Sequence, residues 1–292
     1  NEMKIFMMNK GFNEVINYSF LDKQALENLG IENKSISIKN PLNNSLNTLR
    51  TSLLPSLATN LVFNINRGQN FLNIFEIGKS FSNTSHSEAL NLAGLVYDDE
   101  KFKNWNTKQN YDFFFLKGVL EDFFEEFRIE KISWKRSKND LLHPFASADI
   151  HLKNKLIGSI GSVNPKLLKS LGLSKAFFYF EIKIESLPRK DLRKLLAPSI
   201  YPISQRDFSF EIDKDISYEQ VNECIQNSSK NFLISSRIFD VYDGKNISED
   251  KKSIAFRLSW GSNKKTLSEE DVNNEANLII SGMKKKLGAL LR

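Results

Sequence analysis

The chain has 292 residues, a hydrophobic fraction of 40% and a formal net charge of +6. This length is enough for about two domains with cores of their own, and the composition excludes disorder over a large segment. The sequence has no apolar run of the ~20 residues that a membrane helix needs, and its amino terminus lacks the charged-then-apolar pattern of a signal peptide. The single cysteine, Cys224, excludes an internal disulfide and is consistent with a reducing cytoplasm.

The first part of the sequence predicts an antiparallel sheet flanked by helices over residues 1–187. The chain opens on Asn1 rather than Met and runs directly into a helix-like segment, so we expect a fragment whose upstream part carries further domains. An aromatic-rich helix is predicted over 112–127. The strands predicted in this part span residues 73–81, 89–98 and 177–187.

A basic segment, residues 188–198, is predicted to link two domains. It concentrates four cations, Arg189, Lys190, Arg193 and Lys194. A solvated linker is the favoured interpretation, although contact with a phosphate backbone stays open. Lys and Arg roughly balance Asp and Glu after Ser199, so the positive surplus lies in the first two thirds of the chain.

Residues 199–292 have the pattern of one compact unit, in the order strand, helix, strand, strand, helix, strand. Ser217 and Ser268 are placed to cap the two helices. The predicted strands span residues 206–213, 233–243, 251–261 and 289–292, and the helices start at Tyr218 and after Ser268. This order predicts a ferredoxin-like βαββαβ sandwich, in which two helices cover one face of an antiparallel sheet and leave the other open. The fold class is therefore α+β.

Alternation along the strand over 233–243 assigns its side chains to the two faces of this sheet. Ile238, Asp240 and Tyr242 are expected on one face, the open one. Phe239 and Val241 are expected under the helices. A fully buried Phe239 would contribute about 3 to 5 kcal/mol to stability, measured as the effect of Phe239→Ala.

The strand over 251–261 adds Ser253 and Arg257 to the open face. A tyrosine ring stacks on a base, a carboxylate and a hydroxyl bond to base edges, and a guanidinium binds a phosphate, so these residue types suit RNA. A polar open face is also the norm for such sheets in soluble proteins. The pattern alone therefore leaves base recognition and a plain solvated surface both open.

Motifs in a fixed order identify a family. The series YPISQRDFSFEID, IFDVYDG, KKSIAFRLSW, KTLSEEDV and GALLR closely resembles the ferredoxin-like anticodon-binding domain that ends the beta subunit of bacterial phenylalanyl-tRNA synthetase. Upstream motifs resemble the catalytic-like domain that precedes it in that subunit, among them GFNEVINYSF at Gly11, NIFEIGKSF at Asn73 and IGSIGSVNP at Ile157. The resemblance covers the chain from about Gly11 onward.

The resemblance implies that the terminal domain reads the anticodon of the phenylalanine tRNA. In the family, the Asp and Tyr of a Phe-Asp-x-Tyr strand and the Ser of a Lys-Ser strand approach the first anticodon base. In this sequence these residues are Asp240, Tyr242 and Ser253. A guanine offers its N1 and N2 hydrogens to a carboxylate and its ring to a tyrosine. Arg257 is a fourth candidate site residue, for contact with a phosphate, and it is included only because strand alternation places it on the open face.

The resemblance also implies that the first domain is not catalytic. Class II synthetases hold ATP with an arginine two residues before a glutamate and with a second arginine in a glycine-rich motif, because a transferring phosphate needs fixed positive charge. Here Ile74 stands two residues before Glu76, and no arginine lies near Glu181. We therefore expect no catalytic residue, metal site or cofactor in this chain, with ATP and Mg²⁺ held by the alpha subunit. Arg50 and Glu76 are expected to be core or interface partners.

The implied partners are the alpha subunit, in a cytoplasmic alpha2beta2 heterotetramer, and the phenylalanine tRNA, with no membrane. The aromatic helix offers candidates for the alpha-docking surface or for the core: Phe113, Phe114, Phe115, Phe123 and Phe124. Two other functions stay open, because a ferredoxin-like sandwich supports many. One is a stand-alone module that binds RNA generally, and the other is a small-molecule regulatory domain.

Overall fold

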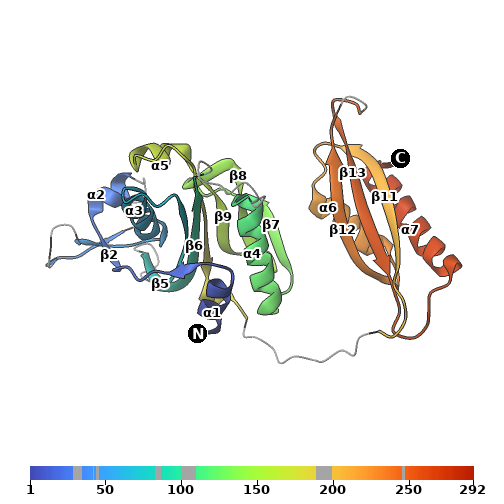
Figure 1. Cartoon of the computed structure of the whole chain (residues 1–292), viewed down its shortest axis with the longest axis horizontal. Helices are drawn as coiled ribbons and strands as arrows, with labels where there is room; N and C mark the ends of the chain where they lie inside the picture. The colour runs from blue at the N-terminus through green and yellow to red at the C-terminus, as the bar shows by residue number, and fades with distance from the viewer. Residues whose placement is uncertain are drawn as a thin grey trace. The chain divides into compact units, whose positions relative to one another are not determined.

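The computed structural model describes residues 1–28, 35–41, 43, 46–82, 87–99, 110–188, 199–244 and 247–292. The chain forms two compact units that divide between residues 192 and 193 (Figure 1). The four cations of the expected basic linker, Arg189, Lys190, Arg193 and Lys194, lie outside the described residues.

The first unit is built on a mostly antiparallel sheet. Among the described residues this sheet has seven strands in the order β1-β5-β6-β10-β9-β8-β7. They are β1 (Asn13–Glu14), β5 (Phe71–Ser82), β6 (Ser87–Asp98), β7 (Ile132–Arg136), β8 (Leu142–Leu152), β9 (Lys155–Val163) and β10 (Phe178–Lys183). Only the β1–β5 pair of this described sheet is parallel. A small sheet pairs β2 (Phe20–Leu21), β4 (Thr48–Leu49) and β3 (Ile36–Ser37).

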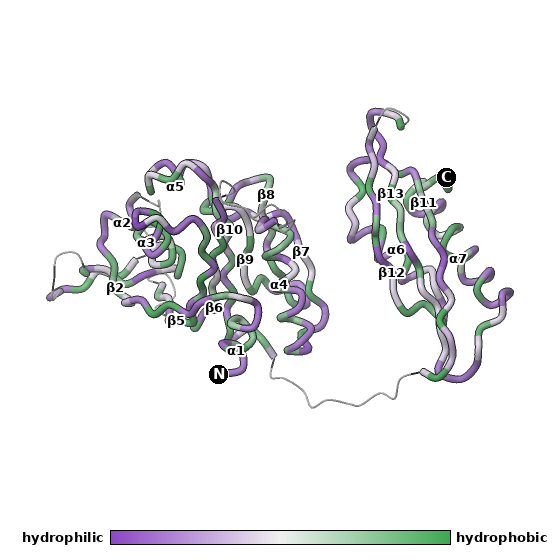
Figure 2. The backbone as a smooth tube through the Cα atoms, viewed as in Figure 1, coloured by the Kyte–Doolittle hydropathy of each residue, from purple (hydrophilic) through white to green (hydrophobic). Residues whose placement is uncertain are grey.

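Helices cover both faces of the seven-stranded sheet, and α3 and α4 lie on opposite sides of β6 and β9 (Figure 1). The helices are α1 (Glu2–Asn9), α2 (Lys23–Asn28), α3 (Leu54–Ile65), α4 (Phe113–Glu126) and α5 (Pro165–Ser170), followed by the 3-10 turn η3 (Ile184–Ser186). One core packs α1 and α4 on the sheet, and the other packs α3 and α5 on its opposite face. Figure 2 shows hydrophobic stretches in β6 and β10, whose buried residues belong to these two cores. The predicted flanked sheet is confirmed.

Helix α4 divides its phenylalanines between the core and the surface. Asp112 caps the helix, accepting a hydrogen bond from the Phe115 backbone nitrogen at 3.0 Å. Phe123 and Phe124 are buried in the core, and Phe113 and Phe115 are partly buried against it. Phe114 is 76% exposed and is thus the one of the five that faces solvent.

The second unit has the predicted order of elements. Its described residues form a four-stranded antiparallel sheet in the order β12-β13-β11-β14. The elements are β11 (Ser204–Asp213), α6 (Tyr218–Ser228), β12 (Leu233–Tyr242), β13 (Lys251–Trp260), α7 (Glu269–Leu287) and β14 (Leu290–Leu291). The first and third strands lie in the middle of this sheet, which is the ferredoxin-like arrangement. The α+β fold class, with this sandwich following the flanked sheet, is confirmed.

Local signals in the sequence set the ends of both helices. Ser217 and Ser268 each form a capping box, the first with Gln220 and the second with Asp271. A capping box satisfies two backbone N–H groups that the first helical turn leaves without partners. Helix α7 ends at Gly288, whose φ of +63° lies in the left-handed region that glycine tolerates best.

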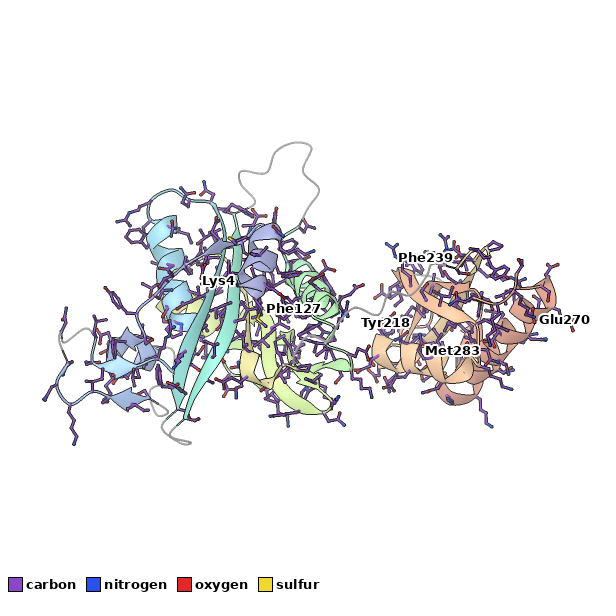
Figure 3. The ribbon with its side chains drawn as sticks, turned by 90° about the horizontal axis from the view of Figure 1, so that it is seen from below. Lys4, Phe127, Tyr218, Phe239, Glu270 and Met283 are labelled. Atoms are coloured by element: carbon purple, nitrogen blue, oxygen red, sulfur yellow. The ribbon has the colours of Figure 1, made fainter. Side chains whose placement is uncertain are left out.

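Both helices pack on one face of the sheet. The core between them is formed by side chains that alternate along β11 and β13 and by one face of α7, including Phe210, Phe256 and Met283. The rings of Phe210 and Phe256 stack with centroids 5.5 Å apart. Tyr218 of α6 and Met283 of α7 both lie on the helical side of the sheet, whereas Phe239 lies on the other side (Figure 3).

The position of Phe239 corrects the sequence-based assignment of faces. Ile238 pairs with Phe256 and Asp240 pairs with Ala255, so Phe239 is the extra residue of a β-bulge. Because side chains alternate with a period of two, one extra residue moves Ile238 to the helical side and Phe239 to the open side. Phe239 is 55% exposed, and the expectation that it is buried under the helices is wrong.

Candidate nucleic-acid interface

The helix-free face of the second unit brings together the residue types predicted from the sequence. Tyr242 lies directly opposite Ser253, and Asp240 lies opposite Ala255 in the next outward-facing pair. Both Asp240 and Tyr242 are exposed. No hydrogen bond joins the Asp240 carboxylate to another residue in the described part of the chain, so its oxygens are open to a donor from solvent or a ligand.

Ser253 lies lower on the same face. It is only 7% exposed, and its hydroxyl lies 3.0 Å from the hydroxyl of Ser209 on β11. A hydroxyl has one donor and two acceptor sites. When Ser209 donates to Ser253, the Ser253 proton is available to an acceptor that approaches from above the sheet.

The ring of Tyr242 lies against the backbone at Gly244. A Cβ atom built on Gly244 would lie 2.2 Å from the Tyr242 hydroxyl oxygen, so the ring has this position only because residue 244 has no side chain. Tyr242 remains 45% exposed. Part of the Tyr242 side chain is thus accessible on the face that carries Asp240 and Ser253.

Arg257 lies on the same face but already has a partner. Its Nε and a terminal nitrogen donate to the two carboxylate oxygens of Asp207 at 2.7 and 2.8 Å. The hydrogen bond from Arg257, with its positive charge, holds the pKa of Asp207 below its usual value. The charge of Arg257 is therefore balanced locally, and its guanidinium is fixed in orientation.

Two residues lie on this face although the sequence did not predict them there. Arg237 lies directly opposite Arg257, and Phe239 lies beside them. With Gln205, Ser235 and Ser259 they line a depression of about 430 Å³. Uninterrupted alternation places Arg237 on the helical side together with Phe239, and only the bulge reveals that both face outward.

In the first unit, Arg50 and Glu76 are buried and bond to one another and to their neighbours. Arg50 and Glu76 form an ion pair at 2.8 Å with side chains only 2% and 4% exposed. Arg50 also donates to the Lys79 carbonyl oxygen at 2.9 Å, and Asn17 donates to Glu76 at 2.8 Å. The expectation that Arg50 and Glu76 are core partners is confirmed.

Glu181, on the neighbouring part of the sheet, is likewise hydrogen-bonded to nearby side chains. Its carboxylate accepts hydrogen bonds from Ser52 and Tyr179, both at 2.6 Å, and from the Asn91 amide at 2.6 Å. Burial, together with the nearby Glu181 charge, raises the pKa of Tyr179 well above its usual value. Tyr179 therefore stays protonated and acts as a donor within this network.

Among the described residues, no group of three or more His, Cys, Asp or Glu side chains lies together in a way that would hold a metal ion. No helix in that part of the chain combines the length and apolarity needed to cross a membrane. His143, at the start of β8, accepts a hydrogen bond from the Phe145 backbone nitrogen through Nδ1 at 3.1 Å, which is a structural role.

Each of the two units matches a family model. Residues 1–184 match the family model described as the phenylalanyl tRNA synthetase beta chain CLM domain. Residues 199–292 match the ferredoxin-fold anticodon binding domain. The chain belongs to the phenylalanyl-tRNA synthetase beta chain family.

Relatives in the beta chain family align along nearly the whole of this chain. The phenylalanine–tRNA ligase beta subunit of Legionella pneumophila (strain Lens) is 33% identical over 287 residues, which are 97% of this chain. The subunit of the same name from Fusobacterium nucleatum is 36% identical over 295 residues, and that from Nitrosospira multiformis is 31% identical over 297 residues. The chain spans about 36% of the length of these curated relatives.

Membership of the beta chain family confirms the resemblance drawn from the motifs. The anticodon-binding match coincides with the unit whose open face carries Asp240, Tyr242, Ser253 and Arg257. The other match coincides with the unit in which Arg50, Glu76 and Glu181 are bonded internally.

Proposed function

We propose that this chain is the tRNA-reading and scaffolding part of a phenylalanine–tRNA ligase beta subunit, and that the open sheet face binds the first anticodon base. The observation that carries the proposal is the exposed pair Asp240 and Tyr242 beside Ser253 on the helix-free face. A guanine stacked on Tyr242 would direct N1–H and N2–H to the Asp240 carboxylate, while Ser253 donates to its O6. Arg257, held by Asp207, completes the face.

Binding of anticodon stem-loops to the full chain tests this proposal. Labelled stem-loops of the phenylalanine tRNA with guanine or cytosine at the first anticodon position are titrated, and affinity is followed by fluorescence anisotropy. We expect guanine to bind more tightly, with Asp240→Asn reducing the guanine preference and Tyr242→Ala weakening binding about fivefold or more. Lys285→Gln, an exposed charge on α7, is the control and should change little.

The same titration separates the alternatives. Equal binding of both stem-loops, with affinity that falls with salt alone, would indicate a general RNA-binding module instead. Absence of RNA binding, together with a rise in melting temperature on addition of an amino acid, would indicate a small-molecule regulatory domain. Either result would contradict anticodon reading by this face.

We further propose that the first unit binds the catalytic alpha subunit in an alpha2beta2 assembly, with ATP and Mg²⁺ held by that partner. Exposed apolar side chains near the start of the chain support this: Ile5 and Met8 on α1, and Ile16 and Tyr18, which are 89% and 75% exposed. A contiguous exposed apolar surface marks an interaction site, so these side chains are the first to substitute. Co-expression with an alpha subunit tests it, since Ile16→Ser with Tyr18→Ser should reduce co-purification while the chain still folds.

We place this assembly in the cytoplasm. The single cysteine, Cys224, is buried and has no disulfide partner, as suits a reducing compartment.

A further inference from the structure

We propose that the depression lined by Arg237 and Phe239 is a second nucleotide subsite, which holds the RNA nucleotide next to the base at Asp240 and Tyr242. Arg237 binds its phosphate, and Phe239 stacks on its base. This inference rests on the proposed function, because it extends the same open face by one nucleotide. The occupant is single-stranded RNA, and the family match assigns no residue of this depression.

Arg237 is the residue proposed to bind the phosphate. It lies directly opposite Arg257, and side chains in such pairs have Cβ atoms about 4.5 to 5.5 Å apart. Like charges placed opposite one another destabilise a sheet. Asp207 balances Arg257 through both carboxylate oxygens, but Arg237 has no ion pair with any described residue. A phosphate in the depression would supply the balancing negative charge.

Phe239 carries the stacking part. The bulge turns it away from the core, so an aromatic ring stands 55% exposed on a face that is otherwise mostly polar. The Arg257 guanidinium lies 5.9 Å from the centroid of this ring. Phe239 therefore has a supported ring with a free surface, which is the form of a stacking platform for bases. Its position away from the helices is visible in Figure 3.

The far wall of the depression supplies hydrogen-bonding groups. Gln205 donates through its amide nitrogen to the Ser259 hydroxyl at 3.2 Å, and Ser235 lies opposite Ser259 on β12. The amide oxygen of Gln205 and the serine hydroxyls can bond to base edges or to a ribose hydroxyl. This wall can therefore bond to a base or a ribose as well as to a phosphate.

The spacing along the strands joins the two subsites. The Asp240–Ala255 pair and the Arg237–Arg257 pair are consecutive outward-facing rows on β13, where residues two apart are separated by about 7 Å. A base at Asp240 and Tyr242 and its neighbour at Phe239 can therefore belong to one continuous strand that crosses the sheet.

Arg237→Gln in the full chain tests the phosphate contact. We expect it to weaken both the guanine and the cytosine stem-loops by the same factor, and to reduce the slope of log affinity against log salt by about 0.7. Without RNA, its melting temperature should equal or exceed that of the unsubstituted chain, because a like-charge pair is removed. Lys285→Gln is the matched loss of charge on α7 and should leave the slope unchanged. An unchanged slope in Arg237→Gln would overturn the inference.

A double-mutant cycle, with one change in the protein and one in the RNA, tests the stacking contact. Stem-loops that are abasic at the nucleotide before or after the first anticodon position are compared with the intact loop, using the unsubstituted chain and Phe239→Ala. We expect Phe239→Ala to weaken the intact loop about fivefold or more, and to have no further effect on one of the two abasic loops. Additive effects with both abasic loops, or no effect of Phe239→Ala on the intact loop, would exclude stacking on this ring.

These outcomes are distinct from failure of the proposed function. Loss of the guanine preference belongs to Asp240, Tyr242 and Ser253, whereas the second subsite affects affinity and salt slope equally for both stem-loops. A guanine preference that persists while Arg237→Gln and Phe239→Ala bind normally would refute the second subsite alone.

Discussion

At the scale of single residues, the proposed base-binding site depends on side chains that would not themselves touch RNA. Ser209 shares a hydrogen bond with Ser253, and Asp207 fixes the guanidinium of Arg257. Gly244 leaves the space in which the Tyr242 ring lies. Pre-positioned groups bind more tightly because less side-chain entropy is lost on binding. The supporting residues should therefore influence affinity without contact.

Gly244→Ala is expected to weaken stem-loop binding severalfold while leaving the melting temperature nearly unchanged. The added Cβ would lie 2.2 Å from the Tyr242 hydroxyl oxygen and 2.3 Å from the nearest ring carbon, and an exposed ring moves aside more easily than the backbone does. The two quantities are measured by anisotropy and by thermal unfolding. Gly118→Ala, where a Cβ would meet nothing within 4 Å inside α4, serves as control and should leave binding unaltered. Normal binding by Gly244→Ala would show that the position of the ring is unimportant.

The Asp207–Arg257 pair should make stability depend on pH in the acid range. Because Arg257 lowers the folded-state pKa of Asp207 below the usual 3.8, the ionised carboxylate stabilises the fold at neutral pH. That contribution is lost as pH falls below the usual value and through the lower folded pKa. Urea unfolding at several pH values should therefore show a difference between the unsubstituted chain and Asp207→Asn that is constant near neutrality and shrinks below about pH 4. A difference that grows on acidification would contradict this, and Glu223→Gln is the exposed control.

At the scale of elements, strand β12 is shaped by contacts at its start and by its bulge. Glu275 of α7 is buried, and its carboxylate accepts hydrogen bonds from the Ser229 hydroxyl at 2.6 Å and from the Lys230 backbone nitrogen at 3.1 Å. These bonds hold the connection between α6 and β12. The bulge at Phe239 then shifts the pairing with β13, so that Arg237, Phe239 and Asp240 all reach the open face.

The elements of this unit were predictable from the sequence because their signals are local. Ser217 and Ser268 predict where the two helices begin. The alternation of β13 places Ser253 and Arg257 correctly on the open face. The bulge was not predictable, since no glycine or proline marks it, and it reversed the faces of Ile238 and Phe239. The Asp207–Arg257 pair joins residues 50 positions apart, so it follows only from the strand register.

The corrected faces change the expected contribution of the two phenylalanines on β12 and β13. Phe239→Ala should alter the free energy of unfolding by less than about 1 kcal/mol, because the ring is half exposed. Phe256→Ala removes a fully buried ring and should destabilise the unit by about 3 to 5 kcal/mol. Urea unfolding measures both. Comparable losses in the two variants would place Phe239 back in the core.

At the scale of the whole molecule, each unit has a core made of its own residues. Two clusters lie on the two faces of the seven-stranded sheet, and a third uses residues between Phe208 and Ala289. Residues 199–292 contain 14 Lys and Arg and 14 Asp and Glu, so the net charge of +6 arises entirely in residues 1–198. The proposed anticodon-reading unit thus relies on a few placed cations, such as Arg237, and not on a general positive field.

Because its core is self-contained, the segment of residues 199–292 should fold when expressed alone. The described core includes four large, fully buried side chains, Trp260, Phe210, Phe256 and Met283, which is substantial for a domain of this size. We expect a single cooperative transition at the melting temperature that this unit has within the full chain, with Phe256→Ala lowering both equally. Circular dichroism of the segment and calorimetry of the full chain measure this. An unfolded segment, or one that melts at a much lower temperature, would mean that residues 1–198 contribute to its stability, and stem-loop measurements would then require the full chain.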